Sequence, residues 1–297
     1  MKNLLAFAII ILLALAGGPS GAASPPLAGG RVCLLAVGVD DYKYLSPLKA
    51  AANNAALFAD SLRAANGHAE ITLLTDGRAT RAAILAAFER YAATLAAGDR
   101  LVIYYSGHGG PSARQYRPAS LYSGDLRWQT ENNLYDETIF PVDAAYDLKS
   151  QITFADLAGR IKKIRHAEIA VILDCAYSAA HDWYIDAPQG QSGASSVRPR
   201  TSLRDLSMYG VTVVEAADWN ETAAADIFGG KQYGIFTYYL ARGLDAGVVR
   251  GGKGAVTLYD AFAYARSVTL QEIGSQHPKI YRGRNPAMPL ADRQTAP

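Results

Sequence analysis

The sequence predicts an α/β fold in which a mostly parallel sheet carries helices on both faces. Continuous apolar runs at residues 32–39, 101–105 and 169–173 are typical of strands that are buried on both faces of a parallel sheet. Segments with the apolar spacing of helices lie between these runs, and this alternation favours right-handed β-α-β units. Two of the runs also end in small-residue turns, where open α/β sheets place their chemistry.

The helices follow in a regular order along the chain. An Ala-rich helix is predicted over residues 47–66, where an Asn-Gly pair ends it. Thr80 is predicted to cap the next helix. Thr153 and Thr257 are predicted to cap two later helices, each with an aspartate three residues further on. Another helix is predicted over residues 234–246.

Composition narrows the class of protein. The chain has 297 residues, enough for one large domain or two small ones, and half of them are apolar. The formal net charge is only +2, and the basic residues form no dense cluster, so we expect no nucleic-acid partner. The two cysteines, Cys33 and Cys175, do not make a disulfide framework, and Cys33 is expected to be a buried structural thiol.

The N-terminus has the layout of a signal peptide. One lysine precedes an apolar run at residues 4–16, and small residues give two candidate cleavage sites, after Ala16 and after Ala23. The run is shorter than the roughly 20 apolar residues that a membrane span needs. We therefore expect residues 1–23 to direct export to the periplasm or out of the cell, with an uncleaved N-terminal anchor as the alternative.

Two strand ends carry the candidate chemistry. The run at residues 101–105 leads into Ser-Gly-His-Gly-Gly, and the run at 169–173 leads into Asp174 and Cys175. If these strands are parallel neighbours, His108 and the turn after Asp174 meet at one edge of the sheet. A histidine that faces a cysteine-bearing turn is the arrangement of a His-activated thiolate nucleophile.

Five sequence blocks, in this order, resemble the caspase-like cysteine peptidases, and the bacterial metacaspase-type branch in particular. The blocks are YYSGHGG (104–110), DETIFPVD (136–143), VILDCAYS (171–178), VEAADWNETA (214–223) and YGIFTYYL (233–240). The first three look like the large-subunit half of the family and the last two like its small-subunit half. The resemblance implies the family fold, a caspase-hemoglobinase-like three-layer α/β/α sandwich with a mostly parallel central sheet.

The resemblance also divides the chain after the signal segment. Residues 31–181 match the large-subunit region, and residues 207–285 match the small-subunit region. Residues 182–206 are expected to be a connector and residues 286–297 a tail. The connector contains three arginines, and a basic-specific peptidase of this family is expected to clip itself there.

Family members are cysteine endopeptidases, and the resemblance implies roles residue by residue. His108 matches the general acid/base. Asp174, Ser106 and Asn54 match positions around the pocket for a basic P1 side chain. Gly109 matches the region that supplies an oxyanion-stabilising backbone amide, a donor typically worth about 10²–10³ in rate. The implied partner is a peptide or protein substrate, and no cofactor is implied.

No metal site is expected from the sequence. A zinc site built from His108, Cys175 and His181 would lack the usual ligand spacing. Some relatives need calcium, but the acidic residues here do not form a recognisable calcium loop. The oligomeric state is left open.

The sequence departs from the family pattern at the nucleophile. The family reads Asp-x-Cys-x-Ser-Gly, whereas here Ala176 stands at the nucleophile position and Cys175 occupies the variable position before it. Neighbouring side chains of an extended segment point to opposite faces, so Cys175 is expected to face away from His108. Asn54 stands where many metacaspases carry an acid, which leaves tight binding of arginine in doubt.

Three hypotheses follow from these departures. In the first, the chain is a pseudoprotease that binds peptides or partner proteins without cutting them. In the second, it still cuts through Cys175 after a local rearrangement. In the third, Ala176 replaces the nucleophile of a working peptidase, and the sequence alone does not separate this hypothesis from the first.

Overall fold

The computed structural model describes the parts of the chain that form the fold. The predicted signal segment at residues 1–23, Ala176, and residues 182–198 of the predicted connector lie outside the described residues. Among the described residues, no helix is both long and apolar enough to cross a membrane. The structure describes residues 30–111, 135–145, 149–164, 166–175, 199–218, 221–245, 247–249 and 255–291.

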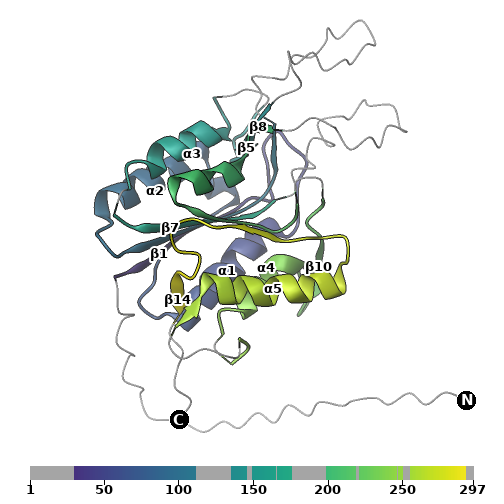
Figure 1. The fold of residues 1–297 in the computed structure, drawn as a ribbon. Coiled ribbons are helices and arrows are strands. Elements are labelled where there is room, and N and C mark those ends of the chain that lie inside the picture. The colour runs from purple at the N-terminus through teal and green to yellow at the C-terminus, as the bar shows by residue number, and fades with distance from the viewer. Residues whose placement is uncertain are drawn as a thin grey trace, which may run out of the picture.

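A six-stranded sheet forms the centre of the molecule (Figure 1). Its spatial order is β13-β9-β7-β3-β1-β2, and every neighbouring pair is parallel except β13 with β9. The predicted mostly parallel sheet is therefore confirmed. The strands are β1 (Val32–Gly38), β2 (Glu70–Thr75), β3 (Arg100–Ser106), β7 (Glu168–Asp174), β9 (Thr212–Glu215) and β13 (Lys279–Tyr281).

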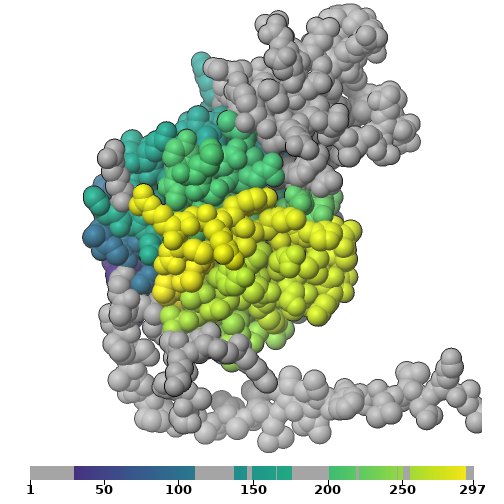
Figure 2. All heavy atoms as spheres, in the orientation of Figure 1, coloured from purple at the N-terminus to yellow at the C-terminus, as the bar shows by residue number. Residues whose placement is uncertain are grey.

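Helices cover both faces of the sheet, so the fold is the predicted three-layer α/β/α sandwich (Figure 1). One layer holds α1 (Ala51–Ala65), α4 (Ile235–Arg242) and α5 (Leu258–Glu272). The other layer holds α2 (Arg81–Thr94), α3 (Phe154–Ile161) and the 3-10 helix η4 (Leu203–Tyr209), while a short 3-10 turn, η1 (Asp76–Arg78), follows β2. Figure 2 shows the yellow C-terminal segment, which contains the edge strand β13, crossing the surface between the two helical layers.

Side chains along the central strands alternate between two hydrophobic cores, because successive side chains of a strand point to opposite faces. On β7, Ile169, Val171 and Leu173 belong to the core that also contains residues of α2 and α3. Ala170 and Ile172 belong to the core formed with α1, α4 and α5. Both faces of β7 are therefore apolar, which explains why its sequence is a continuous apolar run.

The three predicted threonine caps are confirmed, whereas the helix predicted from residue 47 begins at Ala51. Thr80 accepts a hydrogen bond from a backbone N–H in the first turn of α2. Thr153 and Thr257 each form a capping box with the aspartate three residues later, Asp156 at α3 and Asp260 at α5. These side chains satisfy backbone N–H groups that have no partner within the helix.

Short strands outside the central sheet complete the fold. They are the hairpin β10 (Ala225–Phe228) and β11 (Lys231–Gly234), a small sheet of β4 (Gly109–Pro111), β5 (Tyr135–Ile139), β6 (Ile152–Thr153) and β8 (Pro199–Thr201), and the pair β12 (Val256–Thr257) and β14 (Pro289–Ala291).

Strand β14 lies within residues 286–297, where the sequence suggested a tail. It pairs with β12, and Met288 and Leu290 are buried in the core beside α1 and α5. The fold therefore continues to Ala291. Three residues are too few to show the period of a strand, so this element could not be predicted from its sequence.

Arg31 fastens the start of β1 to the turn before β3. Its backbone N–H donates to Asp99 at 2.8 Å, and its guanidinium donates to the same carboxylate at 2.7 Å. The guanidinium also donates to the carbonyl of Thr94, at 2.6 Å. The first strand of the sheet is thus anchored at the residue that precedes it.

Candidate active site

The carboxyl ends of β3 and β7 lie side by side. The two strands pair in parallel with Ser106 opposite Asp174, and β1 ends beside them with Gly38 opposite Ser106. His108 follows Ser106 after one glycine. The predicted meeting of these two strand ends at one edge of the sheet is confirmed.

Three of the predicted site residues share one buried hydrogen-bond network. The amide of Asn54, on α1, donates to Ser106 Oγ at 3.1 Å and to Asp174 Oδ2 at 3.3 Å. Thr237, on α4, donates its hydroxyl to the same carboxylate oxygen. Tyr104 lies 2.6 Å from the Thr237 hydroxyl, so it can donate to that oxygen in turn. Helices from one layer therefore position the donors around the carboxylate at the end of β7.

The contact between Asn54 and Gly234 sets the direction of the amide. The backbone N–H of Gly234 donates to Asn54 Oδ1 at 2.8 Å, which turns the NH₂ group toward Ser106 and Asp174. A side chain at position 234 would not fit, because a Cβ there would lie 2.6 Å from Asp174 Oδ2. An acid at position 54 could not donate these hydrogen bonds when ionised, so asparagine is suited to support a buried carboxylate.

The Asp174 carboxylate is buried, and its surroundings within the described residues are uncharged. It is 5% exposed, and burial raises its pKa from the ordinary 3.8 to about 6, although the hydrogen bond from Thr237 opposes this shift. No lysine or arginine among the described residues forms an ion pair with it. A buried carboxylate of this kind would gain from a cationic side chain supplied by a ligand.

His108 is held by two tyrosines and a loop carbonyl. Its backbone N–H donates to Tyr42 Oη at 2.7 Å, and Tyr105 donates its hydroxyl to the His108 carbonyl. The imidazole packs on the Tyr42 ring with centroids 4.8 Å apart, and its Nε2 lies 2.8 Å from the carbonyl oxygen of Ser46. Since a carbonyl can only accept, Nε2 carries a proton, and in the neutral ring Nδ1 is the basic nitrogen. This is the tautomer that a general base acting through Nδ1 requires.

Comparison with known proteins identifies the family. The family model of the caspase domain matches residues 31–286. The chain belongs to the caspase-domain family. The predicted resemblance is confirmed at the level of the family.

A solved structure supports the fold of this caspase domain. The crystal structure of protein GSU0716 from Geobacter sulfurreducens aligns with a TM-score of 0.57 and 19% sequence identity, over 89% of this chain and 100% of that one. At this identity the likeness shows the fold alone. No curated protein matches the chain.

The Cys175 thiol lies on a different face of the sheet from the Asp174 carboxylate. Cys175 is 5% exposed and belongs to the core that contains Leu173, Tyr42 and Tyr105. Asp174 instead contacts α1 and α4, in the opposite layer. Tyr42 and Tyr105 also hold His108, so the expectation that Cys175 faces away from His108 stays a prediction. Ala176, at the expected nucleophile position, lies outside the described residues.

Gly109, the candidate oxyanion residue, begins β4 directly after His108. It pairs with Ile139 of β5, and the backbone N–H of Phe140 donates to the His108 carbonyl at 3.1 Å. The preceding Gly107 has a φ of +155°, and a Cβ there would lie 2.5 Å from Tyr42 Oη and 2.6 Å from Tyr105 Oη. Gly107 therefore allows the close packing of Tyr42 and Tyr105 around His108.

Three residues of this site were not singled out from the sequence. They are Tyr42, which positions His108, and Thr237 and Gly234, which complete the surroundings of Asp174. Thr237 and Gly234 lie in the block YGIFTYYL, which carried the family resemblance without assigned roles. Tyr42 lies in a loop without a motif, and no sequence signal would have found it.

A second buried acid stands at the same edge of the sheet. Glu215 ends β9, opposite Leu173 of β7, and it is 3% exposed. Burial and the nearby Glu137 raise its pKa from 4.5 to about 8, while Arg204 opposes the shift. Glu137 in turn accepts hydrogen bonds from the Ser202 hydroxyl at 2.6 Å and from a backbone N–H at the start of η4. Glu137 thus fixes the start of η4, the 3-10 helix that leads into β9.

Proposed function

We propose that this caspase domain binds an extended peptide with a lysine or arginine side chain at Asp174, and that residue 176 determines whether the peptide is cut. The observation that carries the proposal is the buried Asp174 carboxylate, which has hydrogen-bond donors around one oxygen and, among the described residues, no ion pair with a cation. The charge and hydrogen bonds of a guanidinium or ammonium group would offset the free energy that this carboxylate loses when it is removed from water. Ser106 offers a hydroxyl oxygen next to it as a further acceptor.

Cutting would need a nucleophile that the sequence lacks at the family position. The methyl group of Ala176 cannot attack a carbonyl. Cys175 packs in the core beneath the sheet edge, which supports a role for it in packing rather than in attack. The chain with this sequence is therefore proposed to bind peptides as a pseudoprotease.

A cysteine at position 176 would restore a familiar reaction. His108 would take the thiol proton through Nδ1, and the thiolate would attack the peptide carbonyl carbon. Collapse of the tetrahedral intermediate would break the C–N bond, with the imidazolium giving its proton to the leaving amine. Water, activated by the same imidazole, would then hydrolyse the thioester.

The test is peptide cleavage by the chain as given, next to Ala176→Cys, Cys175→Ala and His108→Ala, with matched Arg-, Lys- and Asp-terminated reporters. We expect no cleavage by the chain as given. We expect Ala176→Cys to cut after arginine and lysine but not after aspartate, and to lose this activity when combined with His108→Ala. Loss of a nucleophile can cost on the order of 10⁶ in rate, so the gain should be large.

Two results would contradict the proposal. Cleavage by the chain as given that disappears in Cys175→Ala would make Cys175 a working nucleophile. Equal binding of Arg- and Asp-terminated peptides by the chain as given, measured by fluorescence anisotropy, would remove Asp174 as the recognition site for a cation.

Export is a separate proposal that rests on residues 1–23 alone. The lysine, the apolar run and the small residues that follow support cleavage and release from the cytoplasm. Mass spectrometry of the mature N-terminus in a cell fractionation experiment tests it. A full-length chain in the cytoplasmic fraction would count against it.

A further inference from the structure

A groove lies at the other end of β7, at the amino end of the strand. With seven residues in β7, it is roughly 20 Å from the Asp174 carboxylate. Its volume is about 890 Å³, within the range of pockets that hold small organic ligands. Four chain segments line it: the end of α3 and the turn after it (161–164 and 166), the start of β7 (167–169), the end of η4 and its turn to β9 (207–211), and the segment after β13 (282–285).

The floor of the groove is apolar. Ile161, Ile164, Ile169 and Val211 line it, and each of them is less than 10% exposed. The exposed Met208 stands at the rim, with 75% of its surface in solvent. Such a surface is suited to the hydrocarbon part of a ligand.

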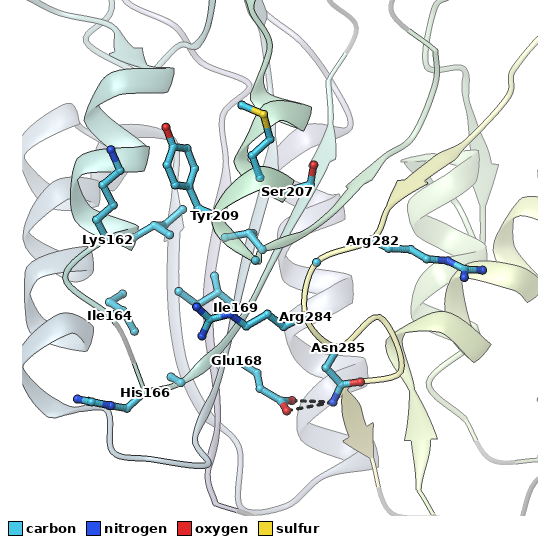
Figure 3. A pocket seen from close by; sticks show the side chains of 16 residues that line it. Lys162, Ile164, His166, Glu168, Ile169, Ser207, Tyr209, Arg282, Arg284 and Asn285 are labelled. Carbon is cyan, nitrogen blue, oxygen red and sulfur yellow. Dashed lines mark hydrogen bonds between the residues drawn. The ribbon is translucent and has the colours of Figure 1, made fainter.

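The polar groups around this floor are mainly cationic. Lys162, His166 and Arg284 are exposed and line the groove, and within the described residues neither Lys162 nor Arg284 forms an ion pair. Among the described residues that line the groove, Glu168 alone carries a carboxylate, and both of its oxygens accept hydrogen bonds from Asn285, at 3.0 and 3.1 Å (Figure 3). Because Asn285 engages this carboxylate, the described basic groups remain available to an anion.

Arg284 is positioned before any ligand arrives. Its backbone N–H donates to the Gly210 carbonyl at 3.0 Å. Gly210 has a φ of +81°, and a Cβ there would lie 2.8 Å from Arg284 Cγ, so the arginine stem packs directly over the glycine. Figure 3 shows the guanidinium reaching across the groove toward Ile164 and Ile169. Arg282, two residues earlier, instead points away, with its guanidinium 5.8 Å from the Tyr259 ring centre.

We infer that this groove binds an organic anion with an apolar body. The apolar floor would take the hydrocarbon part, and Arg284 with Lys162 would take the carboxylate, sulfonate or phosphate group. The inference does not depend on peptide binding at Asp174, because the two sites share only β7. A fatty carboxylate and an aromatic phosphate have this chemistry in common.

The test uses a pair of dyes that differ in one charge. The probe is 8-anilinonaphthalene-1-sulfonate, and its neutral counterpart N-phenyl-1-naphthylamine has the same rings without the sulfonate. Fluorescence titration of the full chain is expected to give tighter binding of the sulfonate. Arg284→Gln should weaken the sulfonate about tenfold or more and leave the neutral dye unchanged, because a charge-assisted hydrogen bond is lost. Lys162→Gln should act in the same direction.

Lys163→Gln is the matched control, since Lys163 is the neighbour of Lys162 and pairs with Glu89 outside the groove, at 3.3 Å. It should bind both dyes as the unchanged chain does. Equal affinity of the unchanged chain for the two dyes would overturn the inference. An equal loss in Lys163→Gln and in Lys162→Gln would also overturn it, because the effect would then reflect overall charge. Circular dichroism of each variant separates a local effect from unfolding.

Competition distinguishes the sources of the anion. Displacement of the sulfonate dye by decanoate would support a lipid-derived ligand, and displacement by phenyl phosphate would support an aromatic phosphate. Displacement by an acidic peptide alone would overturn the small-ligand inference in favour of a protein partner.

Discussion

The two ends of β7 use charge in opposite ways. At the carboxyl end, Asp174 is buried without an ion pair to any described residue, and donors from α1 and α4 hold it. At the amino end, Arg284 stays exposed over an apolar floor without an acidic partner among the described residues. Burial raises the free energy of the ionised Asp174 carboxylate. The Arg284 guanidinium is exposed, so water hydrates its charge. The carboxylate should therefore govern both stability and selectivity, whereas the arginine should govern binding alone.

Replacing the carboxylate should have the largest effect on binding. On the proposed function, Asp174→Asn removes the charge that faces the cation and keeps an oxygen for Thr237 and Asn54. Binding of an Arg-terminated peptide should weaken by about 2–5 kcal/mol, since an ion pair is lost at a buried site. Fluorescence anisotropy measures the change.

The amino end provides the control for this experiment. Arg284→Gln should leave the affinity for the peptide unchanged, because the groove is separate from the peptide site. An equal loss in both variants would show that the two ends of β7 are not independent.

The second prediction concerns pH. Burial raises the pKa of Asp174 to about 6 from the ordinary 3.8. The folded state therefore holds the proton more tightly than the unfolded chain, and the free energy of unfolding should fall as pH rises from about 4 to about 6. Asp174→Asn lacks this titration, so its stability relative to the unchanged chain should rise by about 2–3 kcal/mol across that window.

Urea unfolding at several pH values tests this prediction. Glu215 also titrates, but it does so in both proteins and cancels in the difference. Affinity for an Arg-terminated peptide should move the other way and improve as pH rises through about 6, because the ionised carboxylate binds the cation. A flat difference in stability between pH 4 and pH 7 would contradict the burial of an uncompensated charge.

The third prediction examines how the amino end is built. Gly210→Ala places a side chain at a φ of +81° and against the Arg284 stem. Gly230→Ala has the same φ of +81°, but nothing lies within 4 Å of its Cβ. Both variants should lose about 1–2 kcal/mol of stability from backbone strain. Only Gly210→Ala should also weaken the sulfonate dye, and thermal unfolding with a dye titration separates these effects.

The smallest effect is expected at a surface ion pair. Lys163 and Glu89 have side chains that are 61% and 47% exposed, at a distance of 3.3 Å. Lys163→Gln should change the free energy of unfolding by less than about 0.5 kcal/mol. A larger loss would contradict the view that exposed charges contribute little to the stability of this fold and that the buried carboxylate contributes much more.

Much of the site could be predicted because it follows from strand ends. The apolar runs located β3 and β7, and their parallel pairing brings Ser106 and Asp174 together. Asn54 joined them through the family resemblance. The roles of Thr237 and Tyr42 could not be predicted, because they depend on how a helix and a loop pack against those strand ends. No local pattern encodes such contacts.

The groove at the amino end could not be predicted for the same reason. Its lining comes from segments as distant as α3 and the chain after β13, and only the fold brings them together. The basic residues concerned fall in two short stretches, 160–166 and 282–284, and the sequence does not show that these stretches meet. Strand β14 is a further example, since its pairing with β12 rather than its three residues defines it.

The hydrogen bonds of Arg31 to Asp99 and Thr94 make the N-terminal end of the folded domain resistant to a pulling force. β1 is an inner strand, held on one side by β2 and on the other by β3. Tension that arrives from the N-terminal side must break the charge-assisted hydrogen bonds of Arg31 before it loads the strand. A machine that pulls the chain from that side would therefore have to overcome the contacts of this arginine before it could pull β1 out of the sheet.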